Sequence, residues 1–176
     1  MSITIKPIEA TDIQVISSAF KALGSQRKTP ALYERYLAEQ ERGERLVFLA
    51  HFDGEFAGYG TVEWQSDYPH FAAKGIPEIQ DLNVLPSFRR RGIATKIVDE
   101  AEKRIFERSP VVGIGVGMYS GYGPAQRMYI LRGYVPDGMG LFYKDKPVVP
   151  GKEVLVDDDL VLYLTKEHNP NGVRGL

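Results

Sequence analysis

The chain has 176 residues, enough for one domain with a sizeable buried core, and its 43% hydrophobic and 26% charged residues are ordinary for a globular protein. A formal net charge of −1 argues against binding to nucleic acid or to a membrane surface, which requires an excess of basic residues. The absence of cysteine excludes disulfides, thiolate metal ligands and a cysteine nucleophile, and it fits a reducing cytoplasm.

No apolar run approaches the roughly 18 residues of a membrane span, and the first residues lack a signal-peptide pattern. The three histidines, His51, His70 and His168, are scattered without the spacing of metal ligands. We therefore expect a cytoplasmic protein without a metal site.

The first half of the chain alternates between strand and helix patterns. Apolar residues recur at helical spacing in two segments, the first ended by Gly24 and the second by Gly43. Asp53-Gly54 between two apolar-rich runs is a strong hairpin signal. The predicted elements are a strand at 3–8, helices at 11–24 and 30–42, strands at 45–52 and 55–64, and a polar, aromatic loop at 66–75.

The second half begins with a strand at 78–85 whose alternation slips, because Ile79 and Leu82 have opposite parity. Either a bulge or burial on both faces explains that slip. The helix that follows, up to Arg108, carries one apolar stripe against a sheet, formed by Ile93, Ile97, Ala101 and Ile105.

A glycine-dotted apolar run at 111–118 predicts a buried strand, and Pro124 and Gly133 bound a further helix. The remaining predicted elements are strands at 142–143 and 160–164, a polar connection at 144–159, and a frayed tail at 168–176. This order indicates an α/β (α+β) fold with a mixed sheet, with one domain at 1–166 and a flexible tail at 167–176.

The turn between the strand at 78–85 and the next helix has the composition of an anion site. Arg89-Arg90-Arg91-Gly92 stands at a helix N-terminus, where unpaired N–H groups and the helix dipole favour negative charge, and no carboxylate follows before Asp99. A bound phosphate would offset the cost of these cations, and Gly92 has no side chain to keep a diphosphate from the backbone. The turn by itself predicts phosphate binding and no chemistry.

The run from Ile79 to Ala94 resembles the acyl-CoA signature of the GCN5-related N-acetyltransferases (GNAT). That signature is a strand ending in hydrophobic-x-Val followed by [Gln/Arg]-x-x-Gly-x-[Gly/Ala], and Arg89, Gly92 and Ala94 occupy its specified positions.

A second signature of the family, Ala-x-x-x-Tyr-x-x-x-Gly-Phe, is matched by Ala125, Tyr129, Gly133 and Tyr134. The two motifs are separated by one apolar strand, and the order of elements is similar from Ile3 to about Lys166. The resemblance implies a GNAT-like fold, a mostly antiparallel sheet splayed between strands four and five, and acetyl-CoA as cosubstrate.

The resemblance also assigns roles to residues. Backbone groups of Leu82, Asn83 and Val84 would pair with the pantetheine arm as if it were another strand, and the Val84 N–H would face the thioester oxygen. The diphosphate would lie on the turn and helix N-terminus formed by Arg89, Arg90, Arg91, Gly92, Ile93, Ala94 and Thr95. The arginine side chains would assist at the 3′-phosphate or as surface clamps.

Tyr129 is the candidate general acid, because a tyrosine that titrates near ~10 can protonate a thiolate whose acid has a pKa near ~8.5. Glu78 is the candidate base for the ammonium substrate, with Asp81, Glu63 and water as alternatives. Because the chain lacks cysteine, we expect direct attack by a primary amine in a ternary complex. Tyr122 stands where the family often has an asparagine, and its effect on CoA placement is open.

The acceptor is a small-molecule or protein amine. Its candidate walls are the two N-terminal helices, the 66–75 loop and the 144–159 connection, which also serves as a candidate dimer contact or as plain surface loop. Acidic groups near aromatic ones suit a cationic amine. The aromatic and acidic candidates in these walls are Tyr33, Tyr36, Trp64, Asp67, Tyr68, His70 and Asp157 to Asp159. A homodimer is expected by analogy alone.

Two other functions compete with the enzyme. The first is a non-catalytic acyl-CoA sensor on the same scaffold, against which the retention of Tyr129 argues. The second is a nucleotide-binding or nucleic-acid-binding domain, suggested by Gly113-x-Gly115-x-Gly117. That run lacks the spacing of a dinucleotide loop and a helix immediately after it, and we interpret it as a strand whose small residues permit close backbone approach.

Overall fold

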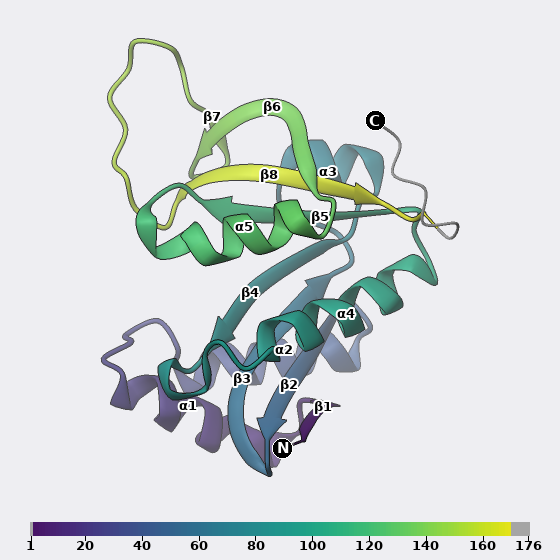
Figure 1. Cartoon of the computed structure of the whole chain (residues 1–176), viewed down its shortest axis with the longest axis vertical. Coiled ribbons are helices and arrows are strands. Elements are labelled where there is room, and N and C mark those ends of the chain that lie inside the picture. The colour runs from purple at the N-terminus through teal and green to yellow at the C-terminus, as the bar shows by residue number, and fades with distance from the viewer. Residues whose placement is uncertain (1, 170–176) are drawn as a thin grey trace. The chain divides into compact units, whose positions relative to one another are not determined.

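The computed structural model describes residues 2–169, which divide into two compact units. The first unit extends to Trp64 and resumes at Ile79–Arg104, and the second comprises Gln65–Glu78 and the residues from Ile105 onward. Both units combine strands and helices, so the predicted α/β class is confirmed (Figure 1). The predicted splay of strands four and five concerns the two units together and stays a prediction.

The first unit has its strands in the order β1-β2-β3-β4. They are β1 (Ile3–Pro7), β2 (Arg45–Phe52), β3 (Glu55–Glu63) and β4 (Glu78–Val84). The pairs β1–β2 and β2–β3 are antiparallel, and Phe52 lies opposite Glu55 across the Asp53-Gly54 turn. The predicted hairpin is therefore confirmed.

Three helices belong to this part of the chain: α1 (Ile13–Ala22), α2 (Pro30–Glu41) and α4 (Ile93–Phe106). The first two bury aromatic and aliphatic side chains against β2 and β3, among them Ile16, Phe20, Tyr33 and Tyr36 around Tyr59. The stripe predicted on α4 is confirmed, since all four of its residues are at most 1% exposed. Helix spacing alone located this packing face.

Strand β4 contains the irregularity that its broken alternation predicts. Asp81 has φ +52°, a left-handed value in the middle of a strand, and the residues from Gln80 to Val84 are all half-buried. A non-glycine residue with this backbone is a local bulge feature rather than a regular strand position. The irregular backbone supports the bulge interpretation over burial on both faces of a regular strand.

The second unit has its strands in the order β5-β8-β6-β7, and the pairs β5–β8, β8–β6 and β6–β7 are all antiparallel. Its elements are α3 (Pro69–Lys74), β5 (Val111–Gly117), α5 (Gly123–Leu131), β6 (Val135–Tyr143), β7 (Lys146–Pro147) and β8 (Leu160–Glu167). The connection between β7 and β8 is extended in Figure 1.

The prediction of a loop at 66–75 is wrong, because α3 occupies most of it. Pro69 stands in the first helical turn and Gly75 closes the helix with φ +63°. Phe71 anchors the helix in a cluster with Tyr68 and Tyr163. The rings of Tyr68 and Tyr163 are stacked, with their centroids 3.6 Å apart. A helix of six residues is stabilised by such packing and is too short to show a helical repeat in the sequence.

Strand β6 begins at Val135, seven residues before the predicted strand at 142–143. It pairs with β8 at both ends and arches away between Pro136 and Leu141, where the register shifts (Figure 1). Gly138 and Gly140, both with positive φ, lie in that arch and interrupt the alternation by which a strand is recognised. Strand β8 likewise runs three residues beyond its predicted end.

The run at Gly113, Gly115 and Gly117 forms β5, as predicted, but for a different reason. A Cβ atom would lie 2.3 Å from the Phe71 ring at Gly113 and 2.4 Å from the Tyr122 ring at Gly117. The glycines therefore make room for aromatic rings, and the predicted close approach of backbone is wrong here. Residues 170–176 of the predicted tail lie outside the described residues.

Candidate functional site

The end of β4 leads into a turn with an unusual backbone. A 3₁₀ turn at Pro86–Phe88 is followed by Arg90 with φ +61° and Gly92 with φ +81°. Arg89, which precedes them, is extended with φ −64° and ψ 157°. Successive N–H groups of a turn can form a concave anion-binding nest. The Arg89 Nε donates a hydrogen bond of 3.2 Å to the Val84 carbonyl and so ties the turn to the strand end.

Helix α4 begins at Ile93, immediately after this turn. Its first hydrogen bond runs from the Lys96 N–H to the Gly92 carbonyl at 3.0 Å. The N–H groups of residues 93–95 consequently have no acceptor within the helix, and the first turn carries no acidic residue. The arginines predicted at the helix N-terminus all precede the first residue of the helix.

The three arginine side chains of the turn are exposed. Arg91 is stacked against aromatic rings, with its guanidinium carbon 4.9 Å from the centre of Phe52 and 5.9 Å from that of Phe88. Arg89 is directed back to β4 by its hydrogen bond. Two of the three arginine side chains thus contact residues next to the turn.

Leu82, Asn83 and Val84 lie half-buried at the end of β4. Strand β3 approaches them closely, because a Cβ atom on Gly58 would be 2.4 Å from the Asn83 carbonyl oxygen and 2.9 Å from the Val84 Cα. The Leu85 N–H donates to the Ala57 carbonyl at 2.9 Å. The first unit therefore contains, in one continuous stretch, the backbone predicted for the pantetheine arm and the turn predicted for the diphosphate.

The two alternative bases in the first unit, Asp81 and Glu63, are already committed to cations. Asp81 forms an ion pair with Lys28, and Glu63 lies 2.8 Å from Arg45. Burial acts to raise the pKa of Asp81, but the charge of Lys28 and the hydrogen bonds it receives outweigh burial and hold that pKa below its usual range. A carboxylate so stabilised is a poor proton acceptor.

Tyr129 lies in α5 of the second unit and is 4% exposed. Its ring is tilted against that of Tyr134, with centroids 5.8 Å apart. Burial raises the pKa of the Tyr129 phenol above its usual value. The phenol is therefore protonated throughout the neutral range, as a general acid must be, but it is a weaker acid than the unperturbed value implies.

Glu78, the first residue of β4, belongs to the second unit and is 5% exposed. Its carboxylate accepts a hydrogen bond from the Ser66 hydroxyl, whose oxygen accepts one from the Tyr68 N–H at 3.0 Å. These contacts orient the Glu78 carboxylate from the segment that precedes α3.

The loop at 119–123 is held by aromatic and acidic side chains. Tyr119 and Tyr122 both donate to Asp158, at 2.6 Å and 3.1 Å, and their rings meet edge to face at 5.0 Å. Tyr122, the departure from the family pattern, thus fastens this loop to the end of the 144–159 connection. Tyr143 donates to Asp157 at 3.2 Å on the same connection.

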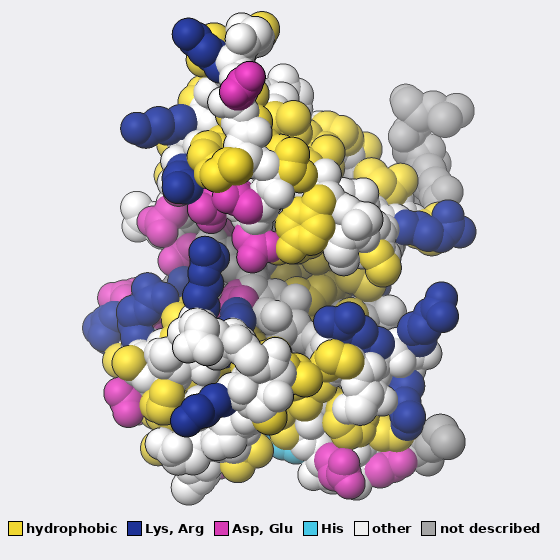
Figure 2. All heavy atoms as spheres, turned by 90° about the vertical axis from the view of Figure 1, so that its left-hand side faces the viewer, with side chains coloured by type: hydrophobic (Ala, Val, Ile, Leu, Met, Phe, Trp, Pro, Cys, Tyr) yellow, Lys and Arg dark blue, Asp and Glu magenta, His cyan; other side chains and the backbone are white. Residues whose placement is uncertain are grey.

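Acidic side chains gather beside hydrophobic ones on this face of the second unit (Figure 2). Other aromatic residues predicted to line an acceptor site lie in the interior of their own units. Tyr33, Tyr36 and Tyr68 are buried in the cores of their units. These three rings are core side chains, and their assignment as acceptor walls stays a prediction.

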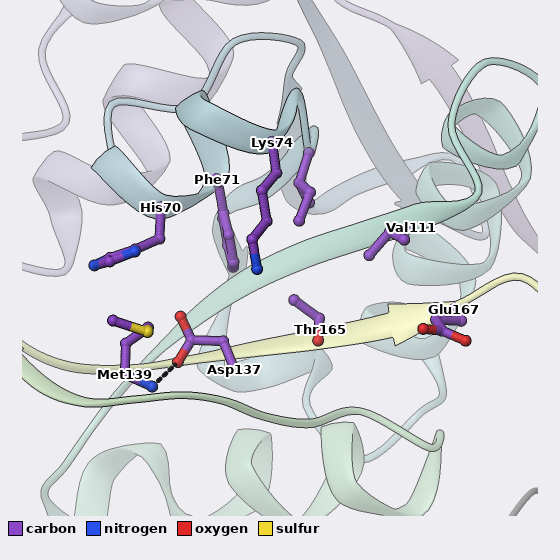
Figure 3. Close-up of a pocket in the computed structure, with 9 residues that line it drawn as sticks. His70, Phe71, Lys74, Val111, Asp137, Met139, Thr165 and Glu167 are labelled. Carbon is purple, nitrogen blue, oxygen red and sulfur yellow. Dashed lines mark hydrogen bonds between the residues drawn. The ribbon is translucent and has the colours of Figure 1, made fainter.

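A separate pocket of about 200 Å³ opens beside α3 in the second unit. In Figure 3, Lys74 extends into it from α3, opposite Asp137 and Met139 of β6. Its lining is completed by His70, Phe71, Ile76, Val111, Thr165 and Glu167. None of the predicted catalytic or cosubstrate-binding residues lines this pocket, whereas His70 of the predicted acceptor walls does.

Residues 13–134 match the model of the acetyltransferase (GNAT) family. The chain belongs to the GNAT family. The matched residues include both signatures, from β4 through α4 to α5, together with the turn before α4 and its positive-φ residues. No match to the chain is found among curated proteins.

Solved structures show the same fold at low sequence identity. A ribosomal-protein-alanine N-acetyltransferase from Brucella melitensis is 16% identical with a TM-score of 0.68, covering 94% of this chain and 99% of its own. The protein yncA from Salmonella typhimurium, solved with its cofactor acetyl-CoA, is 15% identical with a TM-score of 0.68, covering 98% of each chain. A chimeric spermidine N-acetyltransferase, SpeG, from Vibrio cholerae and hSSAT is 15% identical with a TM-score of 0.66, covering 95% and 96%.

The predicted residues thus fall into two sets. The first unit brings together Leu82–Val84 and Arg89–Thr95, and the second contains Tyr129 and Glu78. Within the described residues, no group of His, Cys, Asp or Glu has the arrangement of a metal site, and none of their helices is long and apolar enough to cross a membrane. Sequence reasoning missed the contacts of Asp81 with Lys28, Tyr36 and Tyr59, for which only the slipped alternation gave a signal.

Proposed function

We propose that the protein is an acetyl-CoA-dependent N-acetyltransferase that acts on a primary amine by direct attack. The observation that carries this proposal is the turn at Arg89–Gly92 with the N-terminus of α4. It combines two left-handed residues, exposed cations and a helix start without acidic residues. These features fit a diphosphate held on main-chain amides.

Acetyl-CoA supplies an acetyl group bound as a thioester. The amine nitrogen attacks its carbonyl carbon, and the acetyl group passes to the nitrogen as the carbon–sulfur bond breaks. The chain's own residues bind the cosubstrate and transfer protons. The N–H groups of residues 93–95 bind the diphosphate, and the Val84 N–H donates to the oxygen on which negative charge develops. Glu78 accepts the proton that the ammonium must lose, directly or through water, and the Tyr129 hydroxyl provides the proton that the departing thiolate takes.

The protonation states support these roles. The Tyr129 phenol carries a proton across the neutral range, and burial raises its pKa and so makes it a weaker acid than an exposed tyrosine. Asp81 and Glu63 are engaged by Lys28 and Arg45, which leaves Glu78 as the carboxylate that fits the role of base best.

A cationic amine is the acceptor class that the second unit suits best. Asp157, Asp158 and Asp159 are consecutive, and the first two accept hydrogen bonds from tyrosine hydroxyls. Carboxylates beside aromatic rings attract ammonium groups through charge and cation–π contacts. A structural neighbour that acetylates spermidine agrees with this class.

The test is an amine panel read by mass spectrometry, with polyamines, aminoglycosides and a lysine-containing peptide as acceptors and acetyl-CoA as donor. We expect an added acetyl group on at least one cationic amine and release of a free thiol. Calorimetry with acetyl-CoA runs in parallel. Binding without transfer to any amine would favour the acyl-CoA sensor, and the absence of binding would overturn both.

A further inference from the structure

Asp81 is the centre of a hydrogen-bonded group that the proposed chemistry does not use. We define the Asp81 hub as Lys28, Tyr36, Tyr59, Asp81 and Asn83. One carboxylate oxygen accepts hydrogen bonds from the Lys28 ammonium and from the Asn83 amide, the latter at 2.8 Å. The other accepts from the Tyr59 hydroxyl at 2.5 Å and from the Tyr36 hydroxyl at 3.0 Å.

The hub extends beyond these contacts. The Lys28 ammonium also donates to the Tyr59 hydroxyl oxygen at 2.7 Å, and the Asn83 amide donates to the Asp81 carbonyl at 2.9 Å. Lys28 comes from the connection between α1 and α2, Tyr36 from α2 and Tyr59 from β3. Four segments of the first unit therefore meet at one carboxylate.

The backbone at Asp81 needs this support. Its φ of +52° is unfavourable for any residue with a Cβ atom, and such a conformation persists only where surrounding contacts determine it. Asp53 has a similar φ of +48°, but it lies in a hairpin turn, where such values are common. Asp81 lies inside a strand, so its conformation is set by its partners and not by a turn.

The bulge directly precedes the backbone that the proposed function assigns to the cosubstrate. Leu82, Asn83 and Val84 follow it, and Gly58 of β3 fixes their other side by close approach. The Asn83 side chain belongs to the hub itself. We therefore expect a change in the hub to alter the direction of the next three peptide groups, including the Val84 N–H.

We propose that Asp81 and Lys28 are positioning residues, whose ion pair holds the β4 bulge so that the peptide groups of Leu82–Val84 face the thioester arm. This inference rests on the proposed function. The hub acts through the backbone and touches no reacting atom. Its loss is expected to affect turnover far more than CoA binding, because the diphosphate lies on the separate turn after Arg89.

Four variants test the inference: Asp81→Asn, Asp81→Gly, Lys28→Met and the control Asp53→Gly. Asparagine keeps the shape of Asp81 and tolerates positive φ but removes the charge, whereas glycine relieves the backbone and removes the whole side chain. Asp53→Gly relieves a similar φ at a hairpin remote from the hub. Each is measured for melting temperature, for acetyl-CoA binding by calorimetry, for kcat and KM, and for amide hydrogen exchange by NMR.

We expect the two Asp81 variants and Lys28→Met to lower kcat by about 30-fold or more, while the Kd for acetyl-CoA changes less than about threefold. In the free protein, amide exchange at residues 82–84 should rise about tenfold or more, with exchange in α4 unchanged. Asp53→Gly should match the wild type in both. Glycine adopts a positive φ without strain. Low turnover in Asp81→Gly therefore shows that the side-chain contacts of Asp81 are required, and not only relief of its backbone strain.

Two results overturn the inference alone: turnover within twofold of wild type in Asp81→Asn, or unchanged exchange at residues 82–84. Equal losses of binding, turnover and melting temperature would reduce the hub to a stabilising contact and also overturn it. If the wild-type protein binds no acetyl-CoA, the proposed function itself fails, and this inference fails with it. The wild-type titration separates that case from the others.

Discussion

Replacement of Gly92 by alanine tests the diphosphate site most directly. Gly92 has φ +81°, and a Cβ atom added there would meet nothing nearer than Ile3 Cδ1 at 4.0 Å. The cost is thus one of backbone conformation, about 1–2 kcal/mol for a left-handed alanine, offset by about 0.4–1 kcal/mol of reduced freedom in the unfolded chain. The expected net loss of stability is about 1 kcal/mol, or a fall of about 2–4 °C in melting temperature.

The effect on CoA binding should be larger than the effect on stability. A Cβ atom at Gly92, or a shift of the turn to relieve its φ, removes at least one hydrogen bond between a peptide N–H and the diphosphate. A hydrogen bond to a charged group contributes about 1.5–3 kcal/mol, which corresponds to an affinity about 10- to 100-fold lower. Calorimetric titration with CoA measures that loss at a temperature where both proteins remain folded.

Gly54 supplies the matched control. It has φ +88° in the hairpin between β2 and β3, and a Cβ atom there has open space, so Gly54→Ala carries the same backbone cost without touching the turn. We expect similar melting temperatures for the two variants and wild-type CoA affinity only in Gly54→Ala. Unchanged CoA affinity in Gly92→Ala, or equal losses in both variants, would refute the assignment of the diphosphate to this turn.

Three further outcomes are expected. Tyr129→Phe should lower kcat by about 10²- to 10⁴-fold with acetyl-CoA affinity unchanged, whereas Tyr119→Phe should not; intact turnover across pH 7–9 would rule out the acid role. Glu78→Gln should lower kcat/KM most at neutral pH, and the deficit should shrink as pH rises, because more of the amine is then already deprotonated; a pH-independent deficit contradicts the base role. The pKa of Asp81 in the folded protein lies below its ordinary value of 3.8, so the ionised carboxylate stabilises the fold above pH 3.8, and this contribution is lost as pH falls through the folded-state pKa. The free energy of unfolding, measured in urea from pH 7 to 3, should therefore fall less steeply in Asp81→Asn than in the wild type. Parallel declines in the two proteins would contradict this expectation.

Local patterns predicted those parts of the molecule whose structure is decided locally. The hairpin follows from Asp53-Gly54, and the packing face of α4 follows from helical spacing, because both signals act over a few residues. The turn before α4 was recognised because three cations and a glycine at a helix start conflict with the usual preference. Its positive-φ residue Arg90 was not foreseen, since nothing in its side chain requires that backbone.

The features that were missed depend on partners far apart in sequence. Lys28 and Asp81 are separated by 53 residues, and neither has a neighbour in the chain that indicates the other. Helix α3 depends on the fit of Phe71 beside Gly113, and β6 depends on its pairing with β8 on both sides of an arch. Such contacts form only once the strands are ordered, so a single sequence carries no local record of them.

The slipped alternation of β4 is explained by where its side chains go. Consecutive residues of a regular strand point to opposite faces, yet Gln80 accepts a hydrogen bond from Arg45 at 3.3 Å and Asp81 accepts one from Tyr36 at 3.0 Å. Arg45 lies over the Tyr36 ring at 4.7 Å, so two adjacent residues reach one assembly on the same side of the strand. An extra residue at Asp81 has this effect, because it reverses the parity of every position after it. The shift between Ile79 and Leu82 is thus the trace in the sequence of the bulge that directs Leu82–Val84.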